Sequence, residues 1–340
     1  MNRTQPPVAL TIAGSDSGGG AGIQADLHTF AAHGVHGTSA LTAITAQNTR
    51  GVTAAEAVST DLLRAQLDAV LTDFPVAAVK TGMLGGGDLL AVVAEYGRAD
   101  RLPNLVVDPV MVTTTGDTLF AGDPTAYLAE LGPLATVLTP NLIEAQLLLG
   151  QPIATTDDMR DAARALATYG PRAVLVKGGH LDGEASIDVL WCDGQMLDLA
   201  APRVATRNDH GTGCTLAAAI AARIALEHPL PQAIAGAKAY VTDALKAAAK
   251  RHLGTGPGPV HHHHGQKSTA LLTRPGLAFL FSGTPKARRN ANRGPPVLNP
   301  DRWIRHFTDR TRGERWSRFG WGRAKSRVSV GRVFVFGHHE

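Results

Sequence analysis

From Val8 to about residue 255, short apolar runs alternate with alanine-rich stretches in which apolar residues recur at helical spacing. This alternation is typical of βαβ units around a mainly parallel sheet. It predicts strands at Val8–Ala13, Ser39–Ala46, Ala77–Thr81, Leu105–Asp108, Thr136–Thr139 and Ala173–Lys177. It predicts helices near 22–33, 60–73, 87–97, 123–131, 141–149, 157–169, 213–227 and 231–252. We therefore expect an α/β fold with helices on both faces of a mainly parallel central sheet.

The pattern changes near residue 184 and stops near residue 265. Two short apolar runs, Ser186–Trp191 and Met196–Leu199, flank the turn Cys192-Asp-Gly, which predicts a hairpin at the edge of the sheet. The last predicted helix is followed by GTGPGPV and four histidines. We therefore divide the chain into one domain at 1–265 and an extension at 266–340.

Composition changes at the same place. The formal net charge of +4 averages residues 266–340, with 16 basic and 4 acidic side chains, and a remainder with 17 basic and 25 acidic ones. The extension also holds six of the nine Phe and three of the four Trp. Arginine and proline interrupt its apolar residues throughout, so we expect it to be basic and disordered.

Arginine interleaved with aromatic residues can also bind RNA or DNA through charge and base stacking. The aromatic residues concerned are Trp303, Phe307, Trp316, Phe319 and Trp321. Two simpler explanations are a lineage-specific extension and translation of GC-rich sequence outside the natural frame. We favour these explanations, so a nucleic-acid partner is not expected.

Several broad classes of protein are not expected. No run of about 18 apolar residues occurs, which argues against a membrane-spanning helix. The opening MNRTQPPVAL lacks the apolar core and cleavage site of a secretory signal. Cys192 and Cys214 are too few for a disulfide framework or a four-cysteine zinc site. We expect a cytoplasmic protein.

The segment NDHGTGCTL lies at a predicted junction between a loop and a helix. The backbone N–H groups of Gly211, Thr212 and Gly213 can bind a phosphate there, because a helix dipole favours negative charge at its start. Cys214 would then point at the group that is attacked or activated. Taken alone, Gly-Thr-Gly is also a plain turn before a core helix.

A second glycine-rich segment, GSDSGGGAG, begins at Gly14 after the first predicted strand. It matches neither the dinucleotide-binding pattern GxGxxG nor the P-loop pattern GxxxxGK[ST]. Its glycines would let the backbone approach a small molecule closely, and Asp26 would be available for polar recognition. A mobile surface turn is the alternative.

Two further polar segments, TAQNT and KTGML, end predicted strands. Open α/β sheets bind ligands at the carboxyl ends of their strands. The amide of Gln47 offers a donor and an acceptor in one plane, which suits a ring nitrogen beside an exocyclic amine. Met83 offers an adaptable apolar wall, although a lone methionine is more often a core residue.

Charged residues end the next predicted strands. VVDPVM supplies Asp108, TPNLIE supplies Asn141 and Glu144, and VLVKGGH supplies Lys177. Two carboxylates beside an amide predict Mg²⁺ held largely through water and phosphate oxygens, and a lysine beside them would neutralise a transferring phosphate. The alternatives are a helix cap at Asn141, a solvated Glu144 and an exposed Lys177.

The chain resembles a known family in the order of its segments AGSDSGGGAGIQADLHTF, TAQNT, KTGML, VVDPVM, TPNLIEA, VKGGH and HGTGCTLAAAI. They look like the hydroxymethylpyrimidine and phosphomethylpyrimidine kinases of thiamine biosynthesis, which have the ribokinase-like fold. The resemblance covers about residues 8–262, and even GPGPVHHHH is similar to the family's natural end. It implies that ATP phosphorylates the hydroxymethyl oxygen of 4-amino-5-hydroxymethyl-2-methylpyrimidine, and that a second ATP converts the monophosphate to the diphosphate. It also implies a homodimer.

The resemblance assigns a role to each candidate residue. Gln47 would pair with the aminopyrimidine edge, and the ring would be lined by Gly14, Ala21, Met83 and Val110. Asp26 and Cys214 would face the hydroxymethyl group, with Cys214 as the base. The anion hole would be Gly211, Thr212 and Gly213. ATP would also contact Lys177, Asn141 and Thr212, and Mg²⁺ would be held by Asp108 and Glu144.

Three features depart from the family pattern. TTTGD, which includes Thr114, stands where many members have lysine before Ser-Gly-Asp, and Asp209 adds a negative charge beside the anion hole. The third is the extension at 266–340, which the resemblance does not cover. Cys214 stands where many relatives in the superfamily have aspartate. Two alternatives stay open: a pyridoxal or pyridoxine kinase, and a ligand- or nucleic-acid-binding protein without catalysis.

Overall fold

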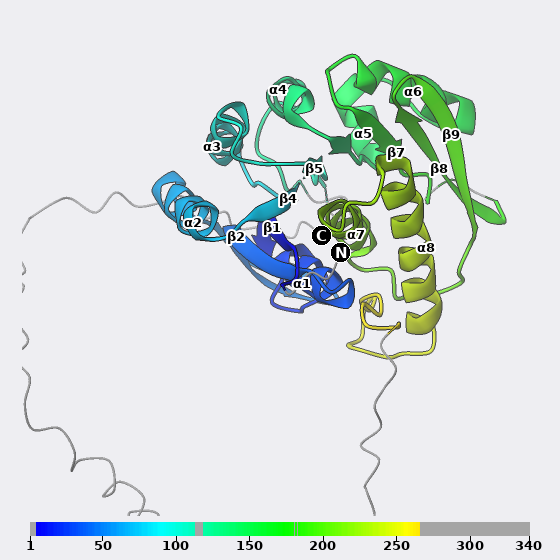
Figure 1. The fold of residues 1–340 in the computed structure, drawn as a ribbon. Helices are drawn as coiled ribbons and strands as arrows, with labels where there is room; N and C mark the ends of the chain where they lie inside the picture. The colour runs from blue at the N-terminus through cyan, green and yellow to red at the C-terminus, as the bar shows by residue number, and fades with distance from the viewer. Residues whose placement is uncertain (1–4, 113–117, 180, 182, 266–340) are drawn as a thin grey trace, which may run out of the picture. The chain divides into compact units, whose positions relative to one another are not determined.

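The computed structural model describes residues 5–112, 118–179, 181 and 183–265 (Figure 1). The strands are β1 (Val8–Ser15), β2 (His36–Asn48), β3 (Gly51–Ala57), β4 (Val76–Thr81), β5 (Leu105–Val107), β6 (Val137–Leu138), β7 (Ala173–Val176), β8 (Ala185–Cys192) and β9 (Gln195–Pro202). The helices are α1 (Gly22–Ala32), α2 (Thr60–Asp73), α3 (Gly87–Arg98), α4 (Pro124–Leu131), the 3₁₀ turn η1 (Gly132–Leu134), α5 (Leu142–Leu149), α6 (Thr156–Ala167), α7 (Thr212–Ala225) and α8 (Leu230–Ala248).

The described strands form one sheet in the order β3-β2-β1-β4-β5-β6-β7-β8-β9. All pairings from β2 across to β7 are parallel, which confirms the predicted mainly parallel sheet. β1 lies between β2 and β4. The strands that directly follow it in sequence, β2 and β3, lie on one side of β1, and β4 and all later strands lie on the other side. Such a switch in strand order opens a crevice at the carboxyl ends of the strands, where ligands of α/β sheets bind.

Helices cover both faces of the sheet (Figure 1), and each face has its own hydrophobic core. The core with α2 to α6 contains Leu10 and Val79, and the core with α1, α7 and α8 contains their chain neighbours Ala9 and Ala78. Successive side chains of a strand point to opposite faces, so a strand covered on both faces is apolar throughout. The prediction of helices on both faces is therefore confirmed.

The predicted edge hairpin is β8 and β9, which pair antiparallel at one end of the sheet. Asp193 and Gly194 make its turn with φ angles of 48° and 80°. Two positive φ angles in succession are the geometry of the tight turn that Asp-Gly predicts.

The opposite edge differs from the prediction. β2 extends to Asn48, and β3, which was not predicted, returns antiparallel beside it. The sequence of β3 is GVTAAEA and its residues are mostly exposed, so it lacks the apolar alternation on which the strand predictions depended. α8 ends at Ala248, before the predicted 252, because its buried face ends at that residue.

After α8 the chain returns to the carboxyl edge of the sheet. The N–H of His210 donates to the carbonyl oxygen of Gly258 at 3.1 Å, and the N–H of Val260 donates to the carbonyl oxygen of His210 at 3.4 Å. Thr114 and the extension at 266–340 lie outside the described residues, so the predictions for them stay predictions. None of the helices in the described part combines the length and apolar character needed to span a membrane.

Candidate active site

The two glycine-rich segments singled out from the sequence touch each other at the carboxyl edge of the sheet. We call residues 14–22 the glycine loop and residues 208–213 the anion loop. A Cβ atom on Gly211 would lie 1.8 Å from the carbonyl oxygen of Gly20, and Gly211 has a φ of 78°. Space and conformation both require glycine there. The two loops therefore belong to one site.

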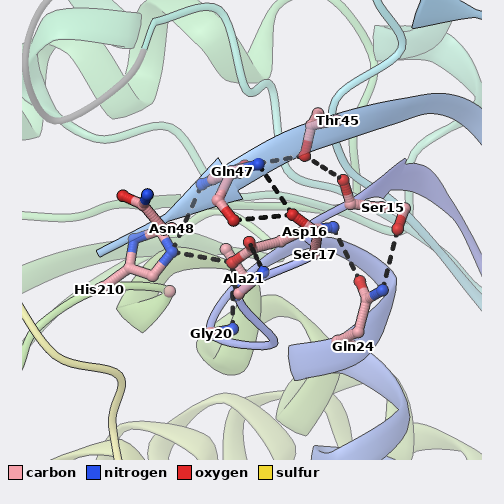
Figure 2. A network of polar contacts seen from close by, with 12 residues as sticks. Ser15, Asp16, Ser17, Gly20, Ala21, Gln24, Thr45, Gln47, Asn48 and His210 are labelled. Atoms are coloured by element: carbon pink, nitrogen blue, oxygen red, sulfur yellow. Dashed lines mark hydrogen bonds and ion pairs between the residues drawn. The ribbon is translucent and has the colours of Figure 1, made fainter. Parts of the chain in front are cut away.

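Asp16 organises the glycine loop (Figure 2). Its Oδ1 accepts the N–H of Gly18 at 2.7 Å, and its Oδ2 accepts the N–H groups of Gly20 at 3.0 Å and Ala21 at 2.8 Å. Oδ2 also lies 2.9 Å from Nε2 of His210. Burial works to raise the pKa of Asp16, but the hydrogen bonds from His210 and the backbone outweigh it and lower the pKa. Asp16 is therefore ionised at neutral pH.

Gln47 lies half-buried beside the glycine loop (Figure 2). Its Nε2 is 3.5 Å from Nε2 of His210, and its Oε1 is 3.3 Å from Oγ1 of Thr45. Its backbone is held on both sides by Ser17, whose hydroxyl accepts its N–H at 2.8 Å and donates to its carbonyl oxygen at 2.7 Å. The amide that was predicted to read the ring is therefore fixed next to the anion loop.

Gly14 lies directly under Met83. A Cβ atom on Gly14 would be 2.4 Å from Cε of Met83, so the glycine makes room for the methionine. Ala21 belongs to the same loop, and Val110 lies half-buried just after β5, where its N–H donates to the carbonyl oxygen of Asp108 at 2.9 Å. These predicted ring contacts therefore come from the ends of β1, β4 and β5, around the switch point.

The start of α7 offers backbone N–H groups to an anion. The N–H of Thr212 donates to the carbonyl oxygen of Asp209 at 3.2 Å, as does its hydroxyl. Within the described part of the chain, the N–H groups of Gly211, Gly213 and Cys214 have no hydrogen-bond partner. The anion hole of Gly211, Thr212 and Gly213 stays a prediction, and the N–H of Cys214 is a further free donor beside it.

A charged cluster lies against Gly213. Nζ of Lys177 is 2.8 Å from Oδ1 of Asp108 and 3.8 Å from Oε2 of Glu144. Oγ1 of Thr139 donates to Oδ1 of Asp108 at 3.1 Å. A Cβ atom on Gly213 would lie 3.3 Å from Nζ of Lys177, so the ammonium adjoins the start of α7. The structure thus brings these predicted residues together beside the anion loop.

Asn141 and Glu144 form a capping box at the start of α5. Oδ1 of Asn141 accepts the N–H of Glu144 at 2.9 Å, and Oε2 of Glu144 accepts the N–H of Asn141 at 2.7 Å. The helix-cap alternative for Asn141 is therefore confirmed. Glu144 is 3% exposed, so the alternative of a solvated glutamate is wrong. Burial raises the pKa of Glu144 to about 7, although Lys177 acts in the opposite direction.

The donors in this cluster fit a hard divalent cation. The ammonium of Lys177 already lies between the carboxylates of Asp108 and Glu144, so the space between them accepts a positive charge. No set of three or more His, Cys, Asp or Glu in the described residues is arranged to hold a metal ion. Mg²⁺ commonly takes one or two carboxylates and completes its shell with water and substrate phosphates. Asp108 and Glu144 fit that mode.

Cys214 lies in the first turn of α7, near the charged side chains of Lys80, Asp26 and Asp108. Burial raises the pKa of its thiol to about 11, although nearby Lys80 acts in the opposite direction. The thiol is therefore mainly protonated at neutral pH.

Asp26 is wholly buried and pairs with Lys80. Its Oδ2 is 2.9 Å from Nζ of Lys80, and neither side chain has exposed surface. The same oxygen accepts the hydroxyl of Thr11 at 2.6 Å. In this structure Asp26 therefore holds Lys80, and its contact with a substrate stays a prediction.

Comparison with known proteins places this site in a family. The family model described as phosphomethylpyrimidine kinase matches residues 16–261. A hydroxymethylpyrimidine/phosphomethylpyrimidine kinase of Rhizobium meliloti is 54% identical over 259 residues, which are 76% of this chain and 97% of the relative. This chain belongs to the phosphomethylpyrimidine kinase family.

Solved structures agree with this membership. A phosphomethylpyrimidine kinase from Clostridium difficile matches with a TM-score of 0.63 at 41% identity, over 71% of this chain and 100% of that one. A pyridoxal kinase from Staphylococcus aureus in complex with AMP-PCP and pyridoxal matches with a TM-score of 0.70 at 34% identity, over 77% and 96%. The predicted ribokinase-like fold and the predicted kinase class are confirmed.

Three residues of this phosphomethylpyrimidine kinase site received no role from the sequence. For Asp16 the available signal is a carboxylate inside a run of glycines. For Lys80 it is a lysine within an apolar strand, which requires a buried partner. No sequence signal joins His210 to Asp16, because 194 positions separate them and only the fold brings them together.

Proposed function

We propose that this kinase transfers the γ-phosphoryl group of ATP to the hydroxymethyl oxygen of 4-amino-5-hydroxymethyl-2-methylpyrimidine, and then phosphorylates the monophosphate to the diphosphate. The observation that carries the proposal is the position of Gln47. Its amide lies 3.5 Å from the ring of His210, and the next residue, Gly211, begins the phosphate-binding turn. An aminopyrimidine bound to Gln47 would therefore lie beside a transferring phosphate.

On the acceptor side, the planar amide of Gln47 pairs with the ring nitrogen and exocyclic amine of the pyrimidine. Gly14 gives the ring close access to the backbone, and Met83 packs on it as an adaptable apolar surface. Ala21 and Val110 complete the ring contacts. Relatives with the printed name of hydroxymethylpyrimidine/phosphomethylpyrimidine kinase, at 54% and 51% identity, support this choice of acceptor.

On the donor side, the free N–H groups at the start of α7 and the ammonium of Lys177 bind the phosphate oxygens of ATP, together with Asn141 and Thr212. Phosphoryl transfer passes through a loose transition state whose charge spreads over the transferred oxygens. Fixed N–H groups and a cation aimed at that charge lower the barrier without reorganisation. Mg²⁺ would neutralise further phosphate charge when bound, with Asp108 and Glu144 as its protein ligands.

In the first step, a bond forms between the hydroxymethyl oxygen and the γ-phosphorus, and the bond from that phosphorus to the leaving ADP oxygen breaks. The proton of the hydroxyl passes to Sγ of Cys214. Because burial keeps this thiol mainly protonated at neutral pH, only a small fraction of the enzyme holds the thiolate that can accept it.

A pyridoxal kinase is the second candidate, because solved pyridoxal kinases from Staphylococcus aureus and Bacillus subtilis share this fold at 34% and 38% identity. Gln47 favours the aminopyrimidine over the pyridoxal ring. We further propose a cytoplasmic homodimer, on the strength of the unpaired Cys192 and Cys214 for the compartment and the family resemblance for the dimer.

The number of ATP molecules consumed tests the two-step proposal. The pyrimidine would be incubated with excess MgATP, ADP would be counted, and the products would be identified by mass spectrometry. We expect two ADP per pyrimidine and a diphosphate as the final product. One ADP per pyrimidine, with the monophosphate as the end point, would contradict the second step.

A further inference from the structure

We propose that His210 is a positioning residue that holds the acceptor side of the active site at a fixed distance from the phosphate side. The inference deepens the proposed function and rests on it, because it takes the glycine loop and Gln47 to be the acceptor side. The observation behind it concerns both the ring and the backbone of His210. The ring contacts the glycine loop and lies next to Gln47 (Figure 2). The backbone leads directly into the phosphate-binding turn at the start of α7.

The ring of His210 joins the glycine loop. Its Nε2 lies 2.9 Å from Oδ2 of Asp16, whose side chain is 3% exposed. That carboxylate already accepts three backbone N–H groups of the loop, so it is an acceptor and Nε2 must be a donor. The same nitrogen lies 3.5 Å from Nε2 of Gln47. One ring atom therefore adjoins both the loop and the amide that would hold the acceptor.

The backbone of His210 is fixed independently of its ring. Its N–H and carbonyl oxygen are both taken by the segment at 258–260, and the next residue, Gly211, is the N-cap of α7. The carbonyl oxygen of Gly211 accepts the N–H of Thr215 at 2.9 Å, which starts the helix. The anchor of the ring is therefore the same chain segment that sets the direction of the phosphate-binding turn.

The contact between the two loops leaves little space for another arrangement. A Cβ atom on Gly20 would lie 2.5 Å from Cδ2 of His210 and 3.1 Å from Cβ of Pro259. The imidazole thus packs on the backbone of Gly20 while its nitrogen binds Asp16. Removing the hydrogen bond would leave packing as the remaining contact between the ring of His210 and the glycine loop, whose own bonds to Asp16 would stay.

The hydrogen bond between His210 and Asp16 lies on the acceptor side, so we expect it to affect kcat rather than the binding of ATP. Lys177, Asp108 and Glu144 do not touch His210 through any described hydrogen bond or ion pair. A misplacement of about 1 Å between reacting groups can cost about a hundredfold in rate. Loss of the link should therefore lower kcat and change the KM for MgATP little.

Two substitutions at His210 separate the effect of losing the hydrogen bond from the effect of changing the size of the side chain. His210→Gln keeps an N–H donor at nearly the reach of Nε2, whereas His210→Leu removes it. We expect His210→Leu to lower kcat by about 30-fold with the KM for MgATP within about threefold, and His210→Gln to stay within about fivefold of the wild-type kcat. His252→Leu, on an exposed loop outside the site, is the matched control and should behave as wild type.

Hydrogen exchange tests the link without any substrate, so it remains decisive if the proposed function fails. Backbone amides of Gly18, Gly20 and Ala21 bind Asp16, and we expect exchange in the peptide that covers them to accelerate at least about tenfold in His210→Leu. It should stay near the wild-type rate in His210→Gln and His252→Leu. Melting temperatures measured in parallel would show that all variants are folded.

Asp16→Ala provides a double-mutant cycle with His210→Leu. Because both changes remove the hydrogen bond between the ring and the glycine loop, the double variant should have a kcat within about twofold of the less active single variant. The inference is overturned by unchanged loop exchange in His210→Leu, by a glutamine variant no better than the leucine variant, or by effects that multiply in the double variant. If the wild-type enzyme does not use the pyrimidine, the proposed function fails while the exchange result still judges the link.

Discussion

At the scale of single residues, burial determines which groups can exchange a proton at neutral pH. Asp16 is ionised because backbone N–H groups and His210 surround it, whereas Cys214 holds its proton because it is buried among acidic neighbours. Glu144 lies between these cases, with a pKa of about 7. The proposed proton acceptor, Cys214, is thus mainly uncharged at neutral pH.

The pH dependence of turnover tests this assignment of Cys214. Below a pKa of about 11 the thiolate fraction grows about tenfold per pH unit, so kcat should rise between about pH 7 and 9. Cys214→Ala should lower kcat by about 100-fold, in the range of general-base loss. Cys214→Asp, which places an ionised carboxylate there, should flatten the profile. Near wild-type turnover of the alanine variant would show that Cys214 is not the base.

The buried pair of Lys80 and Asp26 makes a prediction about stability. Removing one member leaves an unpaired buried charge, so Lys80→Met or Asp26→Leu alone should lower the free energy of unfolding by about 3–5 kcal/mol. The double variant should lose far less, because no charge stays behind. Arg98→Ala breaks an exposed ion pair with Glu130 and should cost less than about 1 kcal/mol.

Urea unfolding measured on all four variants would check this prediction. Single variants at Lys80 or Asp26 that lose no more stability than Arg98→Ala would show that the buried ion pair is not important for stability. A double variant that is less stable than either single variant would show the same.

At the scale of elements, helix starts supply much of the site. α5 begins at the capping box of Asn141 and Glu144, and α7 begins at the turn that leaves its N–H groups free. α6 begins with a second capping box, Thr155 and Asp158, away from the charged cluster. The same local structure therefore occurs once in the site and once outside it.

Variants of these two capping boxes can separate an effect on stability from an effect on activity. Asn141→Ala and Thr155→Ala each remove a capping side chain and should each lower the free energy of unfolding by about 1 kcal/mol. Only Asn141→Ala also removes a side chain that we propose contacts ATP, so only it should lower kcat/KM for MgATP, by about tenfold or more. Unfolding curves and steady-state kinetics of both variants would check this. Equal activity losses would mean that stability alone accounts for the effect.

The elements also show what the sequence could predict. Strands buried on both faces are mainly apolar, so β1, β4 and β7 could be predicted from their runs of apolar residues. β3 could not, because an exposed edge strand carries no apolar pattern. In the site, residues at strand ends were predicted because parallel strands finish at one edge. The contact of His210 with Asp16 and the burial of Asp26 depend on packing between distant segments, which no local pattern reports.

At the scale of the whole molecule, two hydrophobic cores and one catalytic edge lie within residues 5–265. The segment at 258–260 pairs with His210, and the N–H of His261 donates to the carbonyl oxygen of Ala244 at 3.3 Å, so the histidine-rich segment packs on the domain. The extension at 266–340 carries a net charge of +12, opposite in sign to the rest of the chain. We therefore expect the extension to take no part in the kinase reaction.

A chain that ends at residue 265 tests this division. We expect its kcat to stay within about twofold of the full chain, since truncation outside a folded core leaves the site intact. Salt-dependent retention of the full chain, but not the shortened one, on a polyanion column would instead favour the nucleic-acid-binding alternative. Loss of folding or activity on truncation would show that the extension packs on the domain.

The measurement that tests the central claim most directly is ADP release by the purified full chain with MgATP and three acceptors offered in parallel. The acceptors are 4-amino-5-hydroxymethyl-2-methylpyrimidine, its monophosphate and pyridoxal. We predict turnover of both pyrimidines, with kcat/KM for the hydroxymethyl compound at least about tenfold above that for pyridoxal, because Gln47 pairs with the aminopyrimidine edge. A preference for pyridoxal, or no ADP release with either pyrimidine, would contradict the account.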